Sequence, residues 1–309
     1  MDVELTRTGK HSLILHAPVM PAAGTFGYGD CYARLIKTEK LGAVVTDPVT
    51  LKPRRIARGA HAVPLPGGLL LHTGMPNPGV HQVVKQYRQT WDKLPVPVIV
   101  HVMGTIPPDV ERCVRAVVDC PNVQGIELGI HDLTGVEEMR ALIQVVGETT
   151  QLPLLVRLPL ERAAELARVV AATDAGAVVI GAPPRGLARD PISGQLIRGR
   201  VYGPLVKPLA LHTVAQAVQE LQHDDLPVVG CGGIHTAQDA RDFIEVGARA
   251  VQLDSVIWVR PQGAEIIARD LGGFQLTRAA DAYPDEWFPG IGETFRKEAV
   301  PPPPDELPE

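Results

Sequence analysis

The sequence alternates short, β-branched apolar runs with longer stretches of helical pattern, and this alternation is its most constraining feature. Such alternation is typical of βα units stacked around a parallel sheet. The strands of a parallel sheet are buried on both faces, so they need continuous apolar runs. Repeated in eight units, the pattern predicts an α/β fold, a (β/α)8 TIM barrel. The predicted strands are Pro18–Ala22, Ala43–Thr46, Val98–Val102, Gly125–Gly129, Leu154–Leu158, Ala177–Ile180, Val228–Gly230 and Ala250–Leu253.

An open, doubly wound sheet is the other α/β architecture compatible with this alternation. It would more often carry a G-x-G-x-x-G turn after its first strand, and this sequence has none there. A length of 309 residues is typical of one barrel with a few insertions. We therefore expect a single barrel domain over residues 1–298.

Three segments outside the predicted barrel strands have patterns of their own. Val3–Thr6 and Ser12–Leu15 predict an N-terminal β-hairpin within residues 1–16, placed to plug the bottom of the barrel. Residues 183–203 follow the sixth predicted strand with little periodicity, so they predict either a lid loop over the catalytic face or a surface excursion without function. The Pro-rich acidic tail, residues 299–309, is predicted to be disordered because it cannot bury apolar surface.

Helical patterns occupy every gap between the predicted strands. The segment Pro108–Val118 opens with a proline in its first turn, where a missing N–H costs little. Thr134 followed by Glu137, and Thr236 followed by Asp239, predict capping boxes for the helices after the fourth and seventh strands.

Charge and cysteine content exclude several classes of function. The net charge is −5 and no dense Lys/Arg block is present, so neither nucleic acid nor a membrane surface is a predicted partner. The four cysteines form no C-x-x-C pair, which argues against a zinc site or a disulfide framework and favours a reducing cytosol. Asp2 and Glu4 precede any apolar run, and no stretch approaches the roughly 20 apolar residues that span a bilayer. We expect a soluble, cytoplasmic protein.

The seventh predicted strand ends in the sequence Gly230–Ile234, which contains the pair Gly232 and Gly233. Glycines let backbone N–H groups approach an anion closely, and the helix that follows offers its positive end. Phosphate groups commonly bind after the seventh and eighth strands of such barrels. This loop is therefore a predicted phosphate site.

Six motifs, in order along most of the chain, together resemble one enzyme family. They are Pro18–Gly27, Gly42–Arg54, Gly74–Gly79, Pro97–Gly104, Gly203–Leu211 and Pro227–Ile234. The family is class 1 dihydroorotate dehydrogenase, and the long segment before Gly203 is most similar to class 1B, the subclass that works with an iron–sulfur partner subunit. The resemblance implies a barrel with FMN at its mouth, a homodimer, an electron-transfer partner subunit and a small-molecule substrate.

The same resemblance assigns a flavin cradle to residues of this chain. Ala22, Ala23 and Gly24 would pack under the flavin ring, and Arg157 keeps the positive charge of a family lysine. The full set of expected cofactor-binding residues is Ala22, Ala23, Gly24, Asp47, His101, Arg157, Gly203, Gly232, Gly233, Asp254 and Ser255.

Two members of this set carry a charge that the family lacks. The family has a lysine beside the flavin where this chain has Asp47, and Gly-Thr after the eighth strand where it has Asp254 and Ser255. Reversing one charge at ~5 Å from another changes their interaction by several kcal/mol at an effective dielectric of about 20. FMN is therefore expected from the resemblance but opposed by these two carboxylates.

The residues that act on dihydroorotate in the family are also replaced. Its catalytic base is a cysteine in the motif N-x-S-C-P-N, and here that position is Asp132, preceded by His131. A carboxylate can remove a proton when its pKa suits the task, so we expect Asp132 or His131 to handle protons. The alternative for Asp132 is a loop or helix-capping aspartate. The asparagines that hold orotate in the family correspond to Gly129, Thr134, Leu71 and Ala182. Without those partners, we do not expect useful turnover of dihydroorotate.

A polar cluster is also expected at the barrel mouth. His101 ends the third predicted strand, Asp47 follows the second, and Glu127 and His131 lie an even number of residues apart, so both can face inward. Two histidines and one or two carboxylates suit a divalent metal; alternatively they fill a vacated flavin site. No H-x-H or H-E-x-x-H spacing supports a metal, and we assign no metal ligand.

Three functions are compatible with these observations. The first, which the family resemblance favours, is an FMN-dependent oxidoreductase of dihydroorotate dehydrogenase type that acts on another small substrate. The second is a flavin-free, non-catalytic or regulatory relative. The third is a flavin-free lyase or hydrolase that uses His101 and His131, assisted by a metal.

Overall fold

A computed structural model describes residues 2–7, 12–32, 34–59 and 61–279. All eight predicted barrel strands are present and form one parallel sheet in the order β3-β14-β13-β10-β9-β8-β7-β4. Their bounds are β3 (Val19–Pro21), β4 (Val44–Val45), β7 (Val98–Met103), β8 (Val123–Gly129), β9 (Leu154–Pro159), β10 (Ala177–Ala182), β13 (Val228–Cys231) and β14 (Ala250–Leu253).

The sheet nearly closes on itself between its end strands, β3 and β4. Gly42, two residues before β4, donates its backbone N–H to the carbonyl oxygen of Val19 in β3 at 2.8 Å. A Cβ atom on Gly42 would lie 2.0 Å from the carbonyl oxygen of Ala17, so only glycine permits this approach. The predicted (β/α)8 barrel is thus confirmed.

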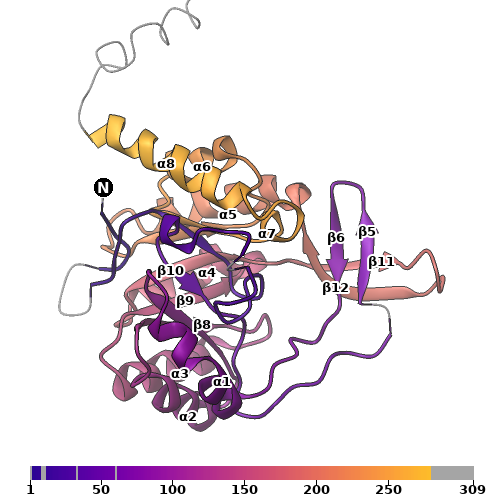
Figure 1. Ribbon diagram of the computed structural model, residues 1–309, viewed down its shortest axis with the longest axis horizontal. Helices are drawn as coiled ribbons and strands as arrows, with labels where there is room; N and C mark the ends of the chain where they lie inside the picture. The colour runs from indigo at the N-terminus through magenta and orange to yellow at the C-terminus, as the bar shows by residue number, and fades with distance from the viewer. Residues whose placement is uncertain (1, 8–11, 33, 60, 280–309) are drawn as a thin grey trace, which may run out of the picture.

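Helices cover the outside of the barrel (Figure 1). They are α1 (Val80–Asp92), α2 (Pro107–Val117), α3 (Val136–Thr149), α4 (Ala163–Ala171), α5 (Lys207–Glu220), α6 (Ala237–Glu245), α7 (Val256–Val259) and α8 (Gly263–Ala279), with the short 3-10 helices η1 (Thr38–Lys40), η2 (Leu160–Arg162) and η3 (Pro204–Val206). The predicted helix Pro108–Val118 is confirmed as α2, shifted by one residue.

The first gap of the barrel departs from the prediction of a helix in every gap. Between β3 and β4, the described residues form only η1. Gly24, Gly27 and Gly29 have φ values of +85°, +69° and +109°, which a right-handed helix does not allow. The chain therefore crosses this gap as a series of glycine turns.

One of the two predicted capping boxes is confirmed and the other is wrong. Thr236 Oγ1 accepts from the backbone N–H of Asp239 at 3.1 Å, and the carboxylate of Asp239 accepts from the N–H of Thr236 at 2.8 Å. Before α3 the contact is shifted by one residue: the N–H of Gly135 donates to Glu138 Oε2 at 3.0 Å. The prediction for Thr134 and Glu137 failed because the helix begins one residue later than the pattern indicated.

The predicted N-terminal hairpin is present and closes the bottom of the barrel. Its strands β1 (Val3–Glu4) and β2 (Ile14–Leu15) are antiparallel. Three leucines of the hairpin region are buried in the apolar cluster inside the barrel, together with inward-facing strand residues such as Met20 and Val229. These leucines are Leu5, Leu13 and Leu15.

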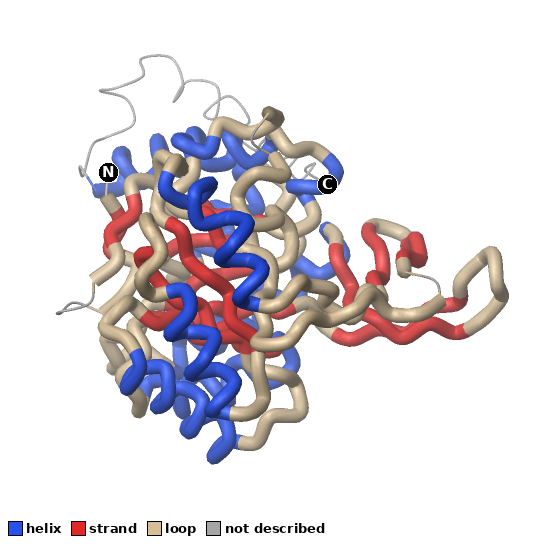
Figure 2. The backbone as a smooth tube through the Cα atoms, turned by 60° about the horizontal axis from the view of Figure 1, so that its bottom comes forward, coloured by secondary structure: helices blue, strands red, loops and turns tan. Residues whose placement is uncertain are grey.

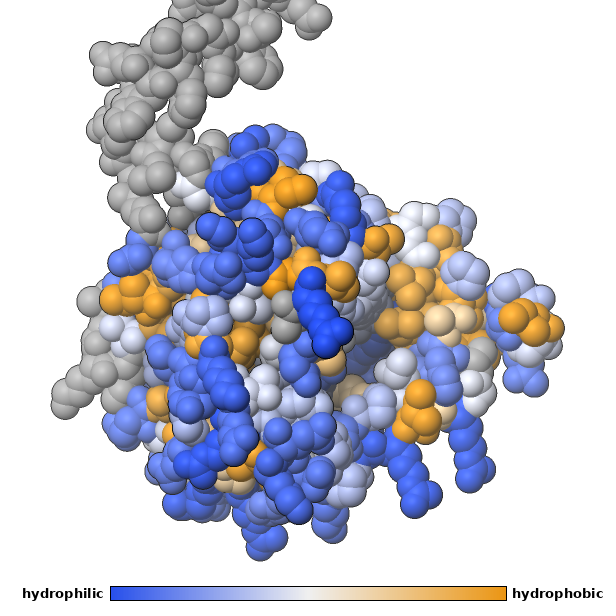
Figure 3. Space-filling view, in the orientation of Figure 1, coloured by the Kyte–Doolittle hydropathy of each residue, from blue (hydrophilic) through white to orange (hydrophobic). Residues whose placement is uncertain are grey.

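A second, four-stranded antiparallel sheet projects from the side of the barrel (Figures 1 and 2). It contains β5 (Ala62–Leu65), β6 (Gly68–Leu71), β11 (Arg185–Arg189) and β12 (Leu196–Tyr202), in the order β11-β12-β6-β5. Residues 183–203, in which little periodicity was found, thus contain the whole β-hairpin of β11 and β12. Exposed apolar side chains gather on this sheet (Figure 3), among them Leu187, Ile192 and Leu196.

The predicted disordered tail, residues 299–309, lies outside the described residues. Within the described part of the chain, no helix has the length and apolar character needed to cross a membrane.

Candidate active site

Glu127 of β8 is the centre of a polar network inside the barrel. Its side chain is fully buried and accepts hydrogen bonds from His101 Nδ1 at 2.8 Å and from Gln252 Nε2 at 2.5 Å. The guanidinium of Arg157 lies 3.8 Å from the same carboxylate. Burial acts to raise the pKa of Glu127, but the hydrogen bond from His101 and the charge of Arg157 outweigh burial and lower it. Glu127 is therefore an anion held by side chains from three other strands.

Arg157 of β9 balances this buried charge. Its guanidinium donates to Gln252 Oε1 at 2.5 Å, to the carbonyl oxygen of Gly181 at 3.1 Å and to Cys231 Sγ at 3.4 Å. Burial acts to lower the pKa of Arg157, but Cys231 and Glu127 raise it, so the side chain stays a cation. A buried charge is costly unless it is paired and hydrogen-bonded. Here Arg157 is the counter-charge of Glu127, and Glu127 is the counter-charge of Arg157.

The imidazole of His101 lies against a glycine on the neighbouring strand β8. His101 is in β7, its side chain is 4% exposed, and its backbone N–H donates to Thr46 Oγ1 at 3.1 Å. A Cβ atom on Gly129 would lie 2.8 Å from His101 Nε2 and 2.0 Å from Met103 Sδ. At this position the resemblance implies a substrate-binding asparagine, and any such side chain here would have to displace the histidine and the methionine.

Asp47 follows β4 and faces the loop after β3. Its Oδ1 accepts from the backbone N–H of Gly27 at 3.0 Å, and its own N–H donates to the carbonyl oxygen of Gly27 at 2.8 Å. Burial raises the pKa of Asp47, against the opposing effects of the Gly27 and Phe26 amides and of His101. Of the predicted cluster of Asp47, His101, Glu127 and His131, the structure joins His101 to Glu127 and brings the charge of His101 to bear on Asp47, whereas the hydrogen bond of His131 is with Leu133.

The carboxylate of Asp254 occupies the amide-rich loop that was predicted to bind phosphate. Asp254 directly follows β14 and is 3% exposed. Its Oδ1 accepts from Ser255 N at 2.5 Å and from Ser255 Oγ at 3.0 Å, and its Oδ2 accepts from Gly233 N at 3.4 Å. Gly232 and Gly233 shape the loop, with φ values of +122° and +72°. An internal anion thus takes amide donors that a phosphate would need.

Two further side chains lie at this loop. His235 Nε2 donates to Ser255 Oγ at 2.9 Å, since the serine hydroxyl itself donates to Asp254. Burial and the nearby charge of Asp254 raise the pKa of Tyr202 to about 12. Sequence reasoning missed both residues, because His235 has no motif spacing and Tyr202 belongs to residues 183–203, which were predicted to be either a lid or a surface excursion. Gln252 was also missed, although a polar residue within an apolar barrel strand was a signal for it.

Asp132, the predicted base, lies at the rim and is paired with the projecting hairpin. Its carboxylate accepts from Arg185 Nε and from Arg200 Nη2, the latter at 2.8 Å. Burial acts to raise the pKa of Asp132, but hydrogen bonds from Arg200 and Arg185 outweigh burial and lower it. Together with five other residues, Asp132 lines a cavity of about 220 Å³: Leu133, Pro159, Glu161, Arg162 and Arg185.

The two predicted proton-transfer residues, Asp132 and His131, have no hydrogen bond or ion pair with the network around Glu127 among the described residues. His131 Nδ1 accepts from the backbone N–H of Leu133 at 3.3 Å. Searched over the described residues, no group of three or more His, Cys, Asp or Glu side chains is arranged to hold a metal ion.

The remaining predicted cofactor residues line the loops after the first and sixth barrel strands. Ala22 is buried and donates its N–H to the carbonyl oxygen of Leu253 at 2.7 Å, Ala23 is half-buried and Gly24 is exposed. Gly203 has a φ of +116°, and a Cβ atom there would lie 2.5 Å from Gly68 Cα. Only Gly24 among them is exposed, so the small size of Ala22 and Gly203 serves close packing of the loops at the mouth.

FMN, which the family resemblance implies, fits these residues at one end only. Ala22, Ala23 and Gly24 suit the flat face of a flavin ring. At the other end, Asp254 would face the phosphate, and no described cationic side chain pairs with Asp254. Two negative charges about 4 Å apart repel strongly in a buried site. The phosphate end of the site therefore does not fit FMN.

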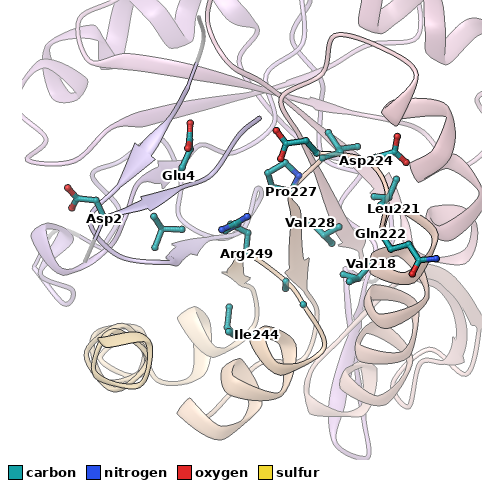
Figure 4. A pocket seen from close by; sticks show the side chains of 15 residues that line it. Asp2, Glu4, Val218, Leu221, Gln222, Asp224, Pro227, Val228, Ile244 and Arg249 are labelled. Carbon is teal, nitrogen blue, oxygen red and sulfur yellow. The ribbon is translucent and has the colours of Figure 1, made fainter. Parts of the chain in front are cut away.

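A larger cavity, of about 540 Å³, lies at the opposite end of the barrel (Figure 4). Its lining includes Glu4, Pro227 and Arg249, which lie at the N-terminal hairpin and at the starts of β13 and β14. Barrel active sites form at the carboxyl ends of the strands, so this cavity is not the candidate active site.

Comparison with known proteins connects this geometry to a family. The profile of the family described as "Dihydroorotate dehydrogenase" matches residues 8–273. A protein of Desulforudis audaxviator named "Dihydroorotate dehydrogenase B (NAD(+)), catalytic subunit" is 34% identical, over 84% of this chain and 89% of its own length. Proteins of the same name from Pelobacter propionicus and Geotalea uraniireducens are each 31% identical, over 84% and 83% of this chain and 90% and 88% of their own lengths. The chain belongs to the dihydroorotate dehydrogenase family of oxidoreductases.

Proposed function

We propose that this member of the family works without FMN and does not oxidise dihydroorotate. The observation that carries the proposal is the contact of the Asp254 carboxylate with the amides of Gly233 and Ser255. A protein that binds FMN by the phosphate loop needs those donors free. Here they already hold a negative charge that belongs to the chain.

Electrostatics sets the size of this effect. Two unit charges ~4 Å apart interact by about 4 kcal/mol at an effective dielectric of about 20. A repulsion of that size lowers affinity roughly a thousandfold, since about 1.4 kcal/mol corresponds to a factor of ten. Asp47 adds to the repulsion at the ring end, where the resemblance implies a lysine that would stabilise an anionic reduced flavin.

The substrate side of the site supports the loss of dihydroorotate oxidation. Asp132, in place of the cysteine base, is neutralised by two arginines and has a lowered pKa, so it is a weak base. The asparagine positions of the family hold side chains that cannot replace the amides: glycine, alanine, leucine and a buried threonine. We expect a steady-state dihydroorotate assay to give no rate above background, whereas a rate equal to that of a class 1B enzyme would contradict this part of the proposal.

The second candidate is an FMN-dependent oxidoreductase that acts on another small molecule. It is favoured by the small residues Ala22, Ala23 and Gly24 and by the cation of Arg157, which are retained where the resemblance expects the flavin ring. A partner subunit, a homodimer and a cytoplasmic location are further proposals for this chain. They are supported by the names of the relatives and by the family resemblance.

A flavin-binding experiment separates the two candidates. Wild type and the variant Asp254→Gly, which restores the family residue, are purified, incubated with excess FMN, desalted and examined by visible absorption. We expect wild type to be colourless and the variant to retain flavin. Asp224→Asn is the control, because it removes one exposed carboxylate at the far end of the barrel. Near-stoichiometric FMN in wild type would refute the proposal and favour the second candidate.

A further inference from the structure

We propose that His101 is a general acid–base catalyst at the barrel mouth, positioned by Glu127, and that it moves a proton within a small carbonyl compound. The family resemblance has no histidine at this position, and neither Asp132 nor His131 is needed for this role. This inference rests on the proposed function, because it assigns an activity to the same mouth in a protein that holds no flavin there.

The first support is the orientation of the ring. Glu127 is ionised and can only accept, so His101 Nδ1 must carry the proton in the 2.8 Å hydrogen bond. Whenever the imidazole is neutral, its lone pair is therefore on Nε2. The carboxylate itself cannot turn away, because Gln252 and Arg157 hold it from the other side. A base oriented by a fixed third group is the arrangement that activates catalytic histidines in many enzymes.

The second support is the position of Nε2. None of the hydrogen bonds among the described residues involves this atom, and the ring is 4% exposed. It lies beside the bare backbone of Gly129, the last residue of β8. The carboxyl ends of the strands form the catalytic face of a barrel. The unpaired nitrogen is therefore at the place where substrates bind in this fold.

The chemistry follows from these two features. Nε2 takes a proton from a carbon next to a carbonyl group, and the electron pair of the broken C–H bond moves into the substrate as an enolate. Glu127 stabilises the imidazolium that forms, as the paired carboxylate does in other histidine-based sites. The imidazolium then returns the proton to the same carbon, and the electron pair of the enolate re-forms the C–H bond. The net reaction is exchange of the α-proton, with epimerisation where the proton returns to the other face of the enolate, and it needs no external oxidant or reductant.

Charge indicates the class of substrate. Around His101 the charged groups are Glu127 from β8, Arg157 from β9 and Asp47 after β4, and Asp254 adds a carboxylate after β14. The rim cluster adds the carboxylate of Asp132 and the guanidiniums of Arg185 and Arg200, so the mouth has four carboxylates against three guanidiniums and its inner part is the acidic part. An anion such as dihydroorotate is disfavoured there, and a neutral or cationic carbonyl compound is favoured.

The test has two independent readouts on the full-length protein. Nitrogen-15 NMR of the histidine side chains, assigned with His101→Asn, reports the tautomer. We expect Nδ1–H with unprotonated Nε2 in wild type, and a shift away from this tautomer in Glu127→Gln. The opposite tautomer in wild type would overturn the inference whether or not a variant folds.

The second readout is proton exchange. Dihydroxyacetone, glycolaldehyde and aminoacetone are incubated with the protein in D₂O, and loss of their α-proton signals is followed by NMR. We expect wild type to exchange at least one of the three, His101→Asn to be slower by about 10²-fold or more, and the exposed His81→Gln to match wild type. No enzyme-dependent exchange, or exchange that survives in His101→Asn, would overturn the inference. FMN retention in the same preparation is measured separately, so failure of the proposed function is recognised by itself.

Discussion

Two ion-pair clusters near the mouth of this barrel use the same chemistry with very different access to water. In the centre, the side chains of Glu127 and Arg157 are 0% and 6% exposed. At the rim, Asp132 is 13% exposed and its partners Arg185 and Arg200 are 52% and 31% exposed. Exposed pairs contribute about 0–1 kcal/mol, whereas breaking a buried pair costs about 3–5 kcal/mol. Burial, more than charge, therefore sets how much free energy is lost when an ion pair in either cluster is broken.

The two clusters also hold different parts of the molecule in place. The central network contributes little net stability when intact, because the desolvation of its ions offsets their attraction. It is costly to rearrange, however, and so it holds the imidazole of His101 in one orientation. The rim pair connects the loop after β8 to the hairpin of β11 and β12. A weak, solvated contact is suited to an element that can detach without unfolding the barrel.

The largest expected effect is that of Glu127→Gln. This variant keeps the volume of the side chain but leaves Arg157 buried without its counter-charge. We expect the free energy of unfolding, measured by urea denaturation, to fall by about 3–5 kcal/mol. Glu111→Gln breaks the exposed pair with Arg115 on α2 and is the matched control, with an expected change within about 0.5 kcal/mol. Equal effects of the two variants would show that burial does not distinguish the pairs.

An intermediate effect is expected for Gly129→Ala. The added methyl group would lie 2.0 Å from Met103 Sδ and 2.8 Å from His101 Nε2, so both side chains must move. Overpacking of this kind costs about 1–3 kcal/mol. Gly147→Ala on α3 is the control with the opposite sign: nothing lies within 4 Å of its Cβ position, and alanine stabilises a helix interior by about 0.5–1 kcal/mol.

A double variant tests whether contact with His101 causes the destabilisation by Gly129→Ala. Asparagine at position 101 is shorter than histidine and vacates part of the space beside Gly129. We expect His101→Asn to reduce the cost of Gly129→Ala by more than about 0.5 kcal/mol in a double-mutant cycle. Additive costs would assign the clash to Met103 alone.

The contrast between centre and rim also explains what could be predicted from the sequence. All eight barrel strands were predicted, because each is a continuous apolar run with a local signature. The projecting sheet was not, because β12 pairs with β6 far earlier in the chain, at contacts such as Arg200 with Leu71. Neither strand is buried on both faces, so neither has the apolar run that identified the barrel strands.

The candidate site, like the fold, could be predicted from the sequence only in part. Spacing along neighbouring strands predicted the pairing of His101 with Glu127 and the nearby position of Asp47, but it also placed in this cluster His131, whose hydrogen bond is with Leu133 instead. The arginine partners of Asp132 could not be predicted, because they belong to the hairpin whose pairing was missed. Nor could spacing show that Asp254 turns onto the amides of its own loop, since that depends on side-chain rotation and on backbone N–H directions that only coordinates provide.

The smallest expected effect on global stability is that of Asp132→Asn at the rim. We expect a loss below about 1 kcal/mol, because its arginine partners are solvated. The local effect should be larger: amide hydrogen exchange in β11 and β12 should become faster in the variant at pH 7, while exchange in β8 stays unchanged. In about 1 M salt, where the Debye length is about 3 Å, wild type should approach the variant.

Acid should loosen the same contact in wild type. The pKa of Asp132 is lowered in the folded protein, since the hydrogen bonds from Arg200 and Arg185 outweigh the effect of burial. The contact is therefore fully present above the unfolded value of about 3.9 and is lost as the pH falls through the lower folded value. Protection of the hairpin should be constant from pH 7 to about pH 5 and fall below about pH 4, with no such step in Asp132→Asn. If the hairpin of wild type and variant exchanged equally at pH 7, Asp132 would not hold it, and only the central network would position side chains at this end of the barrel.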